Sequence, residues 1–453
     1  MNIIVAGCGK IGSVIVQTLE KEGHSLTVID TSAEIINEMT NIYDVMGVCG
    51  SATDCETLSE AGVDKTRLFI SVTDSDELNM LSCYIARKMG AHHTVARIRN
   101  PEYNDRSLGF LREQLNISMA INPEFLLAQE LYNLLRLPAA FKVDYFARRT
   151  LEMIEIRLKE DSPLCNKKLF RLREKQDIQF LIGAVLRQGE LIIPDGNFEL
   201  KAGDTISLTA APNDMQKLLK SLGILKKESR NIMLMGGGKT SYYLAKLLLS
   251  SGSDVKIVEK NENRCLMLSE GLPDAVLIHG DGTQQELLLE EGLRSLDAFV
   301  TLTGMDEENI LTGLFASGQN VPQVIAKVNR KELASMAERL GLDYTISTKA
   351  ITSDLVLRYA RALENSRGSN IETLYKIMDG KAEALEFNVK PDSAVIGTPL
   401  KDMKIKSGIL IAGIIRSGKK AVIPTGNDSI EKGDKVIVLA ADRRLSDLDD
   451  ILR

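Results

Sequence analysis

Three glycines near the amino terminus have the spacing of a turn that can hold a phosphate group. Gly7, Gly9 and Gly12 follow the apolar run 3–6 and open an amphipathic segment. The first glycine of such a turn permits a tight bend, the second lets the backbone approach a pyrophosphate, and the third lets the next helix pack closely. The amino terminus of that helix presents free N–H groups and the positive end of its dipole. The alternative is a turn that serves packing alone.

An acidic residue stands where a ribose would lie. Asp30 ends the second strand-like run, and a carboxylate there can accept hydrogen bonds from ribose hydroxyls. It would repel a phosphate on the ribose, which favours NAD over NADP. Lys10 could contact a phosphate or face solvent. The predicted first site contains Gly7, Cys8, Gly9, Lys10, Ile11, Gly12 and Asp30.

The chain repeats itself at an offset of 229 or 230 residues. NIIVAGCGKIG (2–12) corresponds to NIMLMGGGKTS (231–241), and Asp30 corresponds to Glu259. One register held along most of the chain indicates a tandem duplication. Further matching pairs are 72–81 with 302–311 and 182–210 with 412–440.

The second copy keeps the acid but changes the turn. Ser241 replaces the third glycine, and a residue this small can preserve the packing. The run GKT at 238–240 resembles the end of a P-loop, but Met233 stands where a P-loop requires glycine, which excludes an NTPase. The predicted second site contains Gly236, Gly237, Gly238, Lys239, Thr240 and Glu259.

Polar residues also follow the central strands of both copies. Thr73 and Asp74 in the first copy, and Thr303 in the second, would lie near a bound base or ribose. Arg97 and its counterpart Lys327 end the next strand, where either could pair with phosphate or stay solvated. Arg99 stands two residues beyond Arg97, and we expect only one of the two to contact a phosphate.

Alternating strand and helix patterns position these residues. In the first copy we expect buried strands at 3–6, 26–29, 44–47, 68–72 and 94–98, and helices at 11–22 and 32–41. This alternation predicts an α/β fold with a doubly wound parallel sheet. Residues from about 150 to 225 have short strands and turn signals, typical of a small α+β module. Helices at 124–136 and 350–363 precede the two modules, and their leucines (127, 131, 134 and 135 in the first) could face the chain's own core or an interface.

Four domains follow from the repeat. They are two Rossmann-like domains, each followed by a connecting helix and a small α+β domain. A polar stretch at 226–230 links the halves, and 365–370 is expected to be a flexible joint. The predicted bounds are 1–121, 122–228, 229–348 and 349–453.

Composition narrows the class of protein. The 453 residues carry 56 Lys and Arg against 62 Asp and Glu, a net charge of -6, which argues against nucleic-acid binding. No apolar run approaches the roughly 20 residues of a membrane span, so we expect no direct membrane insertion. The six cysteines form no CxxC pair and the four histidines lie apart from them, so no metal site is expected.

This combination resembles the RCK (KTN) domains of potassium-transport regulators. The resemblance rests on 2–12 with Asp30, on 72–81, on ARIRNPEY at 96–103 and on IIPDGNFELKAGD at 192–204. Two such units in one soluble chain are similar to the peripheral subunits of Trk-type potassium uptake systems. The resemblance covers essentially the whole chain.

The resemblance implies a regulatory, non-catalytic role. Such proteins form a cytoplasmic gating ring, a homo-oligomer such as a tetramer, on the inner face of the membrane. They attach through an integral membrane potassium transporter or channel subunit of Trk type. Their sites bind NAD(H) and also ATP or ADP. The rivals are an NAD-dependent oxidoreductase, which needs a proton-transfer group beside the nicotinamide, and a stand-alone soluble nucleotide sensor.

Overall fold

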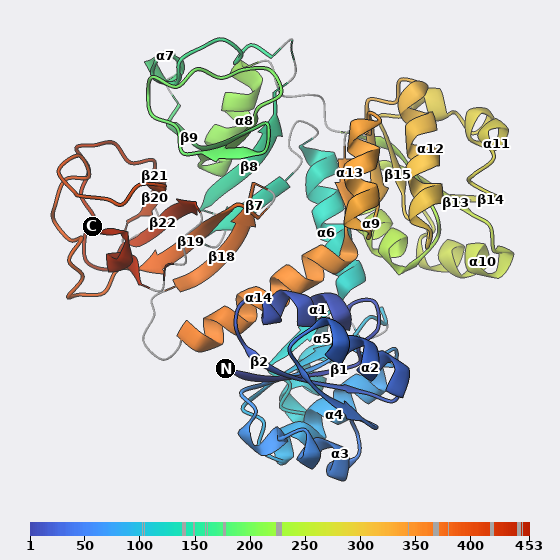
Figure 1. Ribbon diagram of the computed structural model, residues 1–453. Coiled ribbons are helices and arrows are strands. Elements are labelled where there is room, and N and C mark those ends of the chain that lie inside the picture. Colours follow the sequence, from blue (N-terminus) through green and yellow to red (C-terminus); the bar gives the residue numbers. More distant parts are fainter. Residues whose placement is uncertain are drawn as a thin grey trace. The chain divides into compact units, whose positions relative to one another are not determined.

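A computed structural model describes residues 1–101, 103, 105–137, 142–147, 150–158, 160, 162–174, 178–222, 229–342, 344–365, 371–378, 380–416, 421–441, 445 and 447–453. These residues form two compact units, and each unit combines parts of both sequence halves (Figure 1). The first unit contains 1–132 and 229–360, and the second contains 133–228 and 361–453. Most of the predicted linker at 226–230 and of the predicted joint at 365–370 lies outside the described residues.

The first domain of the first unit is a six-stranded sheet in the order β3-β2-β1-β4-β5-β6, with parallel neighbours throughout. The strand order reverses between β1 and β4, which is the topological switch point where such sheets bind ligands. The predicted doubly wound sheet is therefore confirmed. Its strands are β1 (Asn2–Ala6), β2 (Ser25–Asp30), β3 (Met46–Cys49), β4 (Leu68–Ser71), β5 (His93–Arg97) and β6 (Met119–Ile121). Its helices are α1 (Gly12–Glu20), α2 (Ala33–Ile42), α3 (Cys55–Glu60), α4 (Asp76–Lys88) and α5 (Asp105–Gln114), with the 3-10 turn η1 (Val63–Lys65).

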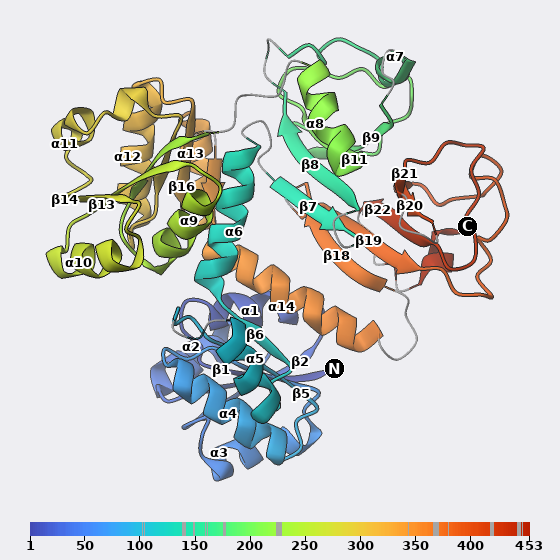
Figure 2. The same cartoon turned by 180° about the vertical axis from the view of Figure 1, so that it is seen from behind.

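The second domain repeats this topology in the order β14-β13-β12-β15-β16-β17 (Figure 2). Its strands are β12 (Asn231–Met235), β13 (Asp254–Glu259), β14 (Val276–His279), β15 (Ala298–Thr301), β16 (Gln323–Lys327) and β17 (Tyr344–Ile346). Its helices are α9 (Lys239–Ser250), α10 (Glu262–Gly271), α11 (Gln285–Glu290), α12 (Asp306–Gly318) and α13 (Lys331–Arg339), with η2 (Leu293–Ser295).

One predicted strand was misplaced by two residues. The sequence pattern put a strand at 44–47, whereas β3 begins at Met46. The chain is still turning before that point, because Tyr43 N–H closes α2 on Met39 and Val45 N–H donates to Tyr43 O. Only Val48 is buried in this edge strand, so the apolar pattern that marks a strand was weak.

Each connecting helix of the first unit contacts the Rossmann-like domain of the other half. Phe125 of α6 (Pro123–Arg136) packs edge-on against Tyr243 of α9. Tyr359 of α14 (Thr348–Asn365) lies edge-on to His93 at the start of β5. The leucines of α6 (127, 131, 134 and 135) are buried within this chain. Of the two predicted alternatives, the chain's own core or an interface, the structure therefore supports the core.

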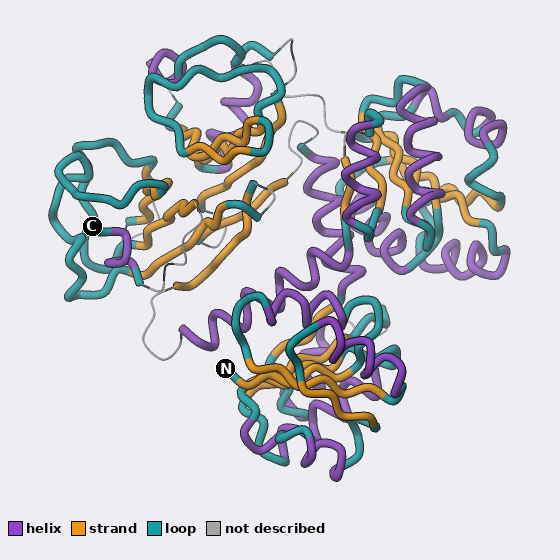
Figure 3. The backbone as a smooth tube through the Cα atoms, viewed as in Figure 1, coloured by secondary structure: helices purple, strands orange, loops and turns teal. Residues whose placement is uncertain are grey.

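The second unit contains two antiparallel sheets, which confirms the predicted small α+β domains (Figure 3). Their orders are β10-β9-β11-β8-β7 and β18-β19-β22-β20-β21. The first module contains β7 (Lys142–Phe146), β8 (Leu151–Arg157), α7 (Leu169–Glu174), β9 (Phe180–Arg187), β10 (Glu190–Ile192), β11 (Thr205–Ala210) and α8 (Pro212–Ser221). The second contains β18 (Ile371–Ile377), β19 (Ala382–Asn388), β20 (Ile409–Ile415), β21 (Ala421–Val422), β22 (Lys435–Ala441) and η3 (Leu448–Ile451).

Two buried glutamates join these modules reciprocally. Glu155 of the first module accepts a hydrogen bond from Met378 N–H, and Glu386 of the second accepts one from Ala147 N–H. Met378 and Ala147 both have positive φ angles, 52° and 46°. The two copies are thus paired in the same way from either side, as a duplicated chain can be.

Candidate nucleotide-binding site

Two glycines of the first turn are fixed by close backbone packing. Gly7 has φ 89°, and a Cβ there would lie 2.8 Å from Thr73 N. A Cβ on Gly12 would lie 1.9 Å from Gly7 O, so the start of α1 must contact the turn directly. A Cβ on Gly9, in contrast, would meet no atom within 4 Å. The middle glycine therefore faces open space, where a ligand can approach the backbone.

Asp30 is held beside this turn at the carboxyl end of β2. One carboxylate oxygen accepts a hydrogen bond from Cys8 N–H at 2.8 Å, and the other accepts one from Ser32 N–H at 3.0 Å. A carboxylate has about four acceptor positions, so two remain for ribose hydroxyls. Asp30 thus both shapes the turn and has acceptor capacity left for a ligand.

The amino terminus of α1 has no side-chain cap. The next three helices of the same domain are capped, by Ser32, Asp54 and Ser75. An uncapped helix start leaves N–H groups that an anion can bind. Lys10 is exposed at this turn and Ile11 is partly buried.

A buried asparagine holds the loop after β4. Asn79 Oδ1 accepts from Thr73 N–H at 2.8 Å and from Thr73 Oγ1 at 2.7 Å. Its amide donates to Thr73 O at 3.1 Å and to Arg97 O at 2.9 Å. Asn79 is fully buried. The ends of β4 and β5 are therefore fixed relative to each other at the carboxyl edge of the sheet.

Arg97 and Arg99 both contact Asp74 but otherwise have different partners. Arg97 is 5% exposed, and its guanidinium donates to Thr73 O at 2.5 Å and to Asp74 Oδ1 at 3.1 Å. Its Nε has no partner among the described residues. Burial, and then the neighbouring Arg99, lower the pKa of Arg97. Arg99 instead pairs with Asp76, which also accepts from Arg99 N–H at 2.8 Å.

The thiol of Cys8 is an unreactive part of the turn. Burial, and then the charge of Asp30, raise the pKa of Cys8 from 9.0 to about 12. The nucleophilic thiolate is therefore nearly absent at neutral pH. Cys8 contributes its N–H group and its volume to the site.

The second turn keeps the acid-to-turn contacts with a longer side chain. Gly236 has φ 100°, and Gly237 N–H donates to Glu259 Oε2 at 2.6 Å. Glu259 Oε1 accepts from Asn261 N–H at 2.7 Å. The helix α9, which begins at Lys239 directly after the exposed Gly238, also lacks a side-chain cap. The geometry found around Asp30 is thus repeated.

At the third position of the second turn, a serine replaces the glycine and makes a hydrogen bond. Ser241 is fully buried and its hydroxyl donates to Gly236 O. Thr240 is also buried, and Lys239 is partly buried. The serine therefore packs inside the turn, as its small size allows.

A buried asparagine also holds the loop after β15. Asn309 Oδ1 accepts from Thr303 N–H and Oγ1, and its amide donates to Thr303 O and Lys327 O. Lys327 Nζ donates to Leu302 O at 3.2 Å. Burial lowers the pKa of Lys327. Gly304 follows Thr303, so nothing here corresponds to the side chain of Asp74.

Several positioning residues were missed by sequence reasoning. Asn79 and Asn309 occupy the same register of the repeat, as do Asp76 and Asp306, which accept from two N–H groups each at the end of the next strand. Identical polar residues in both copies were the available signal. Arg264 had no such signal, because Ile35 occupies the equivalent position in the first copy. The Nε atom of Arg264 nevertheless donates to Gly237 O at 2.7 Å.

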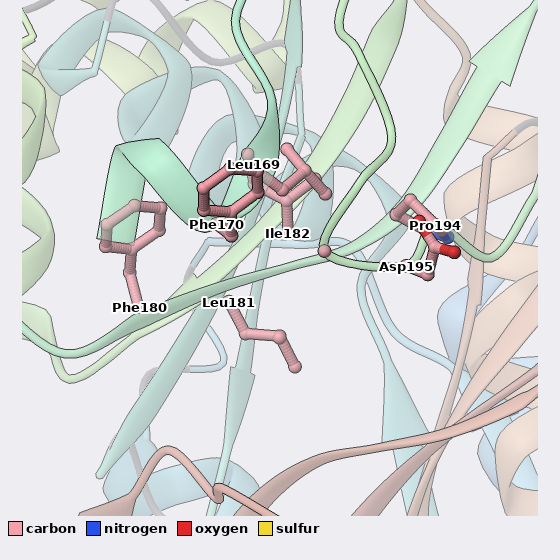
Figure 4. A pocket seen from close by; sticks show the side chains of 8 residues that line it. Leu169, Phe170, Phe180, Leu181, Ile182, Pro194 and Asp195 are labelled. Carbon is pink, nitrogen blue, oxygen red and sulfur yellow. The ribbon is translucent and has the colours of Figure 1, made fainter. Parts of the chain in front are cut away.

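Other candidate sites are sparse. The first small module has a hollow of about 150 Å³ lined mainly by apolar side chains such as Phe170, Ile182 and Pro194 (Figure 4). Within the described ranges, no group of three or more His, Cys, Asp or Glu side chains could hold a metal ion. No described helix is both long and apolar enough to cross a membrane.

The fold and the paired glycine turns define a class of protein. It is the class with two Rossmann-like RCK domains in tandem, each followed by a small α+β domain. The chain matches the TrkA-N domain model at residues 3–123 and 232–348, and the TrkA-C domain model at 153–223 and 384–453. The chain therefore belongs to the TrkA family.

Known relatives extend over the whole chain. It is 30% identical to the Trk system potassium uptake protein TrkA homolog of Archaeoglobus fulgidus, covering 100% of both chains. It is also 30% identical to Trk system potassium uptake protein TrkA of Vibrio alginolyticus, covering 98% of this chain and 96% of that one.

A solved structure has the same fold at low sequence identity. The GsuK RCK domain superposes with a TM-score of 0.64 at 16% identity, covering 97% of this chain and 92% of that chain. The GsuK channel bound to NAD gives a TM-score of 0.65 at 18% identity, covering 97% and 77%. At this identity the likeness establishes the RCK fold.

Proposed function

We propose that this chain is the nucleotide-binding regulatory subunit of a Trk-type potassium uptake system. The observation that carries the proposal is the set of hydrogen bonds that both copies repeat around the candidate site. Both TrkA-N domains hold an acid against an uncapped glycine turn and fix the neighbouring loop with a buried asparagine. Relatives that match the whole chain are Trk system potassium uptake proteins.

NAD(H), ATP and ADP are the proposed ligands. All three contain an adenosine ribose, which Asp30 or Glu259 would bind, and a phosphate chain, which the starts of α1 and α9 would bind. Gly9 would allow the backbone to approach the phosphates. Arg97 and Lys327 would place a positive charge at the same edge of each sheet.

Regulation requires that the ligand bind two conformations with different affinity. The helix that follows the second glycine turn is joined to the first half of the chain, because α6 contacts α9. In the other direction, α14 contacts the start of β5. A nucleotide that closes the Thr73 or Thr303 loop would therefore alter the relation between the two domains. A full switch needs roughly 5 kcal/mol of differential affinity, which several sites in one assembly can share.

The proposed assembly is a homo-oligomeric gating ring, a tetramer, beneath an integral membrane subunit of Trk type. The chain would lie on the cytoplasmic face of the membrane and attach through that partner. No turnover of the nucleotide is needed for this role, because binding alone supplies the free energy of the switch.

Reconstitution tests this proposal. A Trk-type membrane subunit in phospholipid vesicles is assayed for rubidium uptake alone, with the purified chain, and with the chain plus NADH, ATP or ADP. We expect uptake to depend on the chain and to change with the nucleotide. Rubidium uptake that is the same with and without the chain would contradict the regulatory role and favour a stand-alone sensor. Oxidation of NADH by any of a panel of ketones and keto acids would favour the oxidoreductase.

A further inference from the structure

Tyr243 joins the helix of the second nucleotide site to the first domain. It lies one turn into α9, the helix that the second glycine turn opens. Its hydroxyl donates to Arg99 O at 3.1 Å and accepts from Asn122 Nδ2 at 3.0 Å. Its ring packs edge-on against Phe125, with ring centroids 5.3 Å apart.

The partners of Tyr243 belong to the frame of the first site. Arg99 follows Arg97 by two residues, and its N–H group is fixed by Asp76. Asn122 caps the connecting helix α6, because its Oδ1 accepts from Phe125 N–H at 2.9 Å. One hydroxyl thus connects α9 to the end of β5 and to the start of α6.

The reverse link is missing in the repeat. Val14 of α1 occupies the position of Tyr243 in the first copy and has no hydrogen-bonding group. Ser347 repeats the helix cap of Asn122 through Ala350 N–H at 3.3 Å, but Ala350 stands where Phe125 packs. The contact is therefore asymmetric in structure, because only the helix of the second site supplies the hydroxyl.

The hydroxyl has to remain protonated to make both hydrogen bonds. Donation to Arg99 O requires the proton, and burial raises the pKa of Tyr243 above its ordinary value. The link is therefore present across the physiological pH range.

We propose that Tyr243 is a positioning residue through which nucleotide at the second site strengthens binding at the first. Nucleotide on the second turn would fix α9, and the hydroxyl would then restrain Arg99 and the neighbouring Arg97. A site that is already restrained loses less entropy when its own ligand binds, which gives positive coupling. This inference rests on the proposed function, because it needs nucleotide at both turns.

A double-mutant cycle on the full chain tests the coupling. NADH is titrated by calorimetry into wild type, Glu259→Ala, Tyr243→Phe and the double variant. Glu259→Ala disables the second site, and we expect it to weaken first-site binding roughly fivefold, the strength of about one hydrogen bond. In the Tyr243→Phe background the same substitution should leave first-site affinity unchanged. A merely structural role of Tyr243 would not remove this dependence.

Tyr242→Phe is the matched control. Its ring lies against Gly271 of α10, where a Cβ would be 2.9 Å from it, and it should retain the full coupling. An equal effect of Glu259→Ala with and without the Tyr243 hydroxyl would overturn the inference while leaving the sites in place. Absence of NADH and ADP binding in every chain would instead overturn the proposed function.

Discussion

The two Rossmann-like domains keep the same hydrogen bonds around the glycine turn but fill the turn in different ways. In the first, Cys8 donates to the short side chain of Asp30. In the second, Gly237 donates to Glu259, which is longer by one methylene group. A Cβ at position 237 would lie 2.6 Å from Leu268 Cδ1 and 2.9 Å from Glu259 Oε2. Leu268 and the longer acid therefore take the space of the missing side chain.

The third turn position shows a second such exchange. The helix α9 begins at Lys239, the counterpart of Lys10, whereas α1 begins two positions later in the repeat, at Gly12. Ser241 then fits and donates to Gly236 O. The second turn is thus a different packing solution for the same contacts, and the substitutions in it do not by themselves indicate a lost site.

The largest difference between the turns should appear at their third positions. Gly12→Ala places a Cβ 1.9 Å from Gly7 O, so we expect a loss of about 3 kcal/mol in the free energy of unfolding and no nucleotide binding at the first site. Ser241→Ala removes one hydrogen bond and should cost about 1 kcal/mol. Urea unfolding and NADH titration measure both. Equal costs would show that the turns do not differ as described.

The second-largest difference should be in nucleotide affinity after replacement of the cations at the strand ends, Arg97 and Lys327. Arg97→Leu removes two hydrogen bonds that hold the Thr73 loop, and we expect first-site affinity to fall about tenfold. Lys327→Leu removes one and should weaken the second site only about threefold. Arg97→Lys, which keeps the charge but not the fork, should recover part of the loss. A larger effect at Lys327 would reverse the comparison.

The thiol of the first turn predicts an alkaline effect that Gly237 cannot produce. The pKa of Cys8 is raised to about 12, so between pH 9 and 12 the unfolded chain releases this proton while the folded chain keeps it. Stability should therefore fall as pH rises above 9, by up to about 1.4 kcal/mol per pH unit. Urea unfolding at pH 8, 9 and 10 should show a shallower fall for Cys8→Ala. The exposed Cys49→Ala should match wild type, and an unchanged slope in Cys8→Ala would contradict the assignment.

The smallest difference concerns an ion pair found in the second domain. Lys260 lies 2.7 Å from Asp281 and, with Thr283, lowers the pKa of Asp281 to about 2. Thr31 and Ser51 stand at these positions in the first domain. The stabilisation is complete above pH 3.8 and is lost as pH falls toward 2. Because the Lys260 side chain is largely exposed, Asp281→Asn should cost less than about 1 kcal/mol in thermal unfolding at pH 7.

The glycine turns, the acids that follow them and the repeat could be predicted because each has a local signal in the sequence. The sheets follow from buried apolar runs, and β3 was misplaced where only Val48 is buried. The contacts of Tyr243 were not predicted, since they join residues 121 and 144 positions apart in the sequence. The grouping of both nucleotide domains in one unit also had no local signal, because it depends on packing between the halves.

Counting nucleotide sites tests the central claim most directly. Calorimetric titration of NADH, and separately of ADP, into the wild-type chain should give two sites per chain. Asp30→Ala and Glu259→Ala should each leave one, and the double variant none. Two sites in both single variants, or none in wild type, would contradict the account.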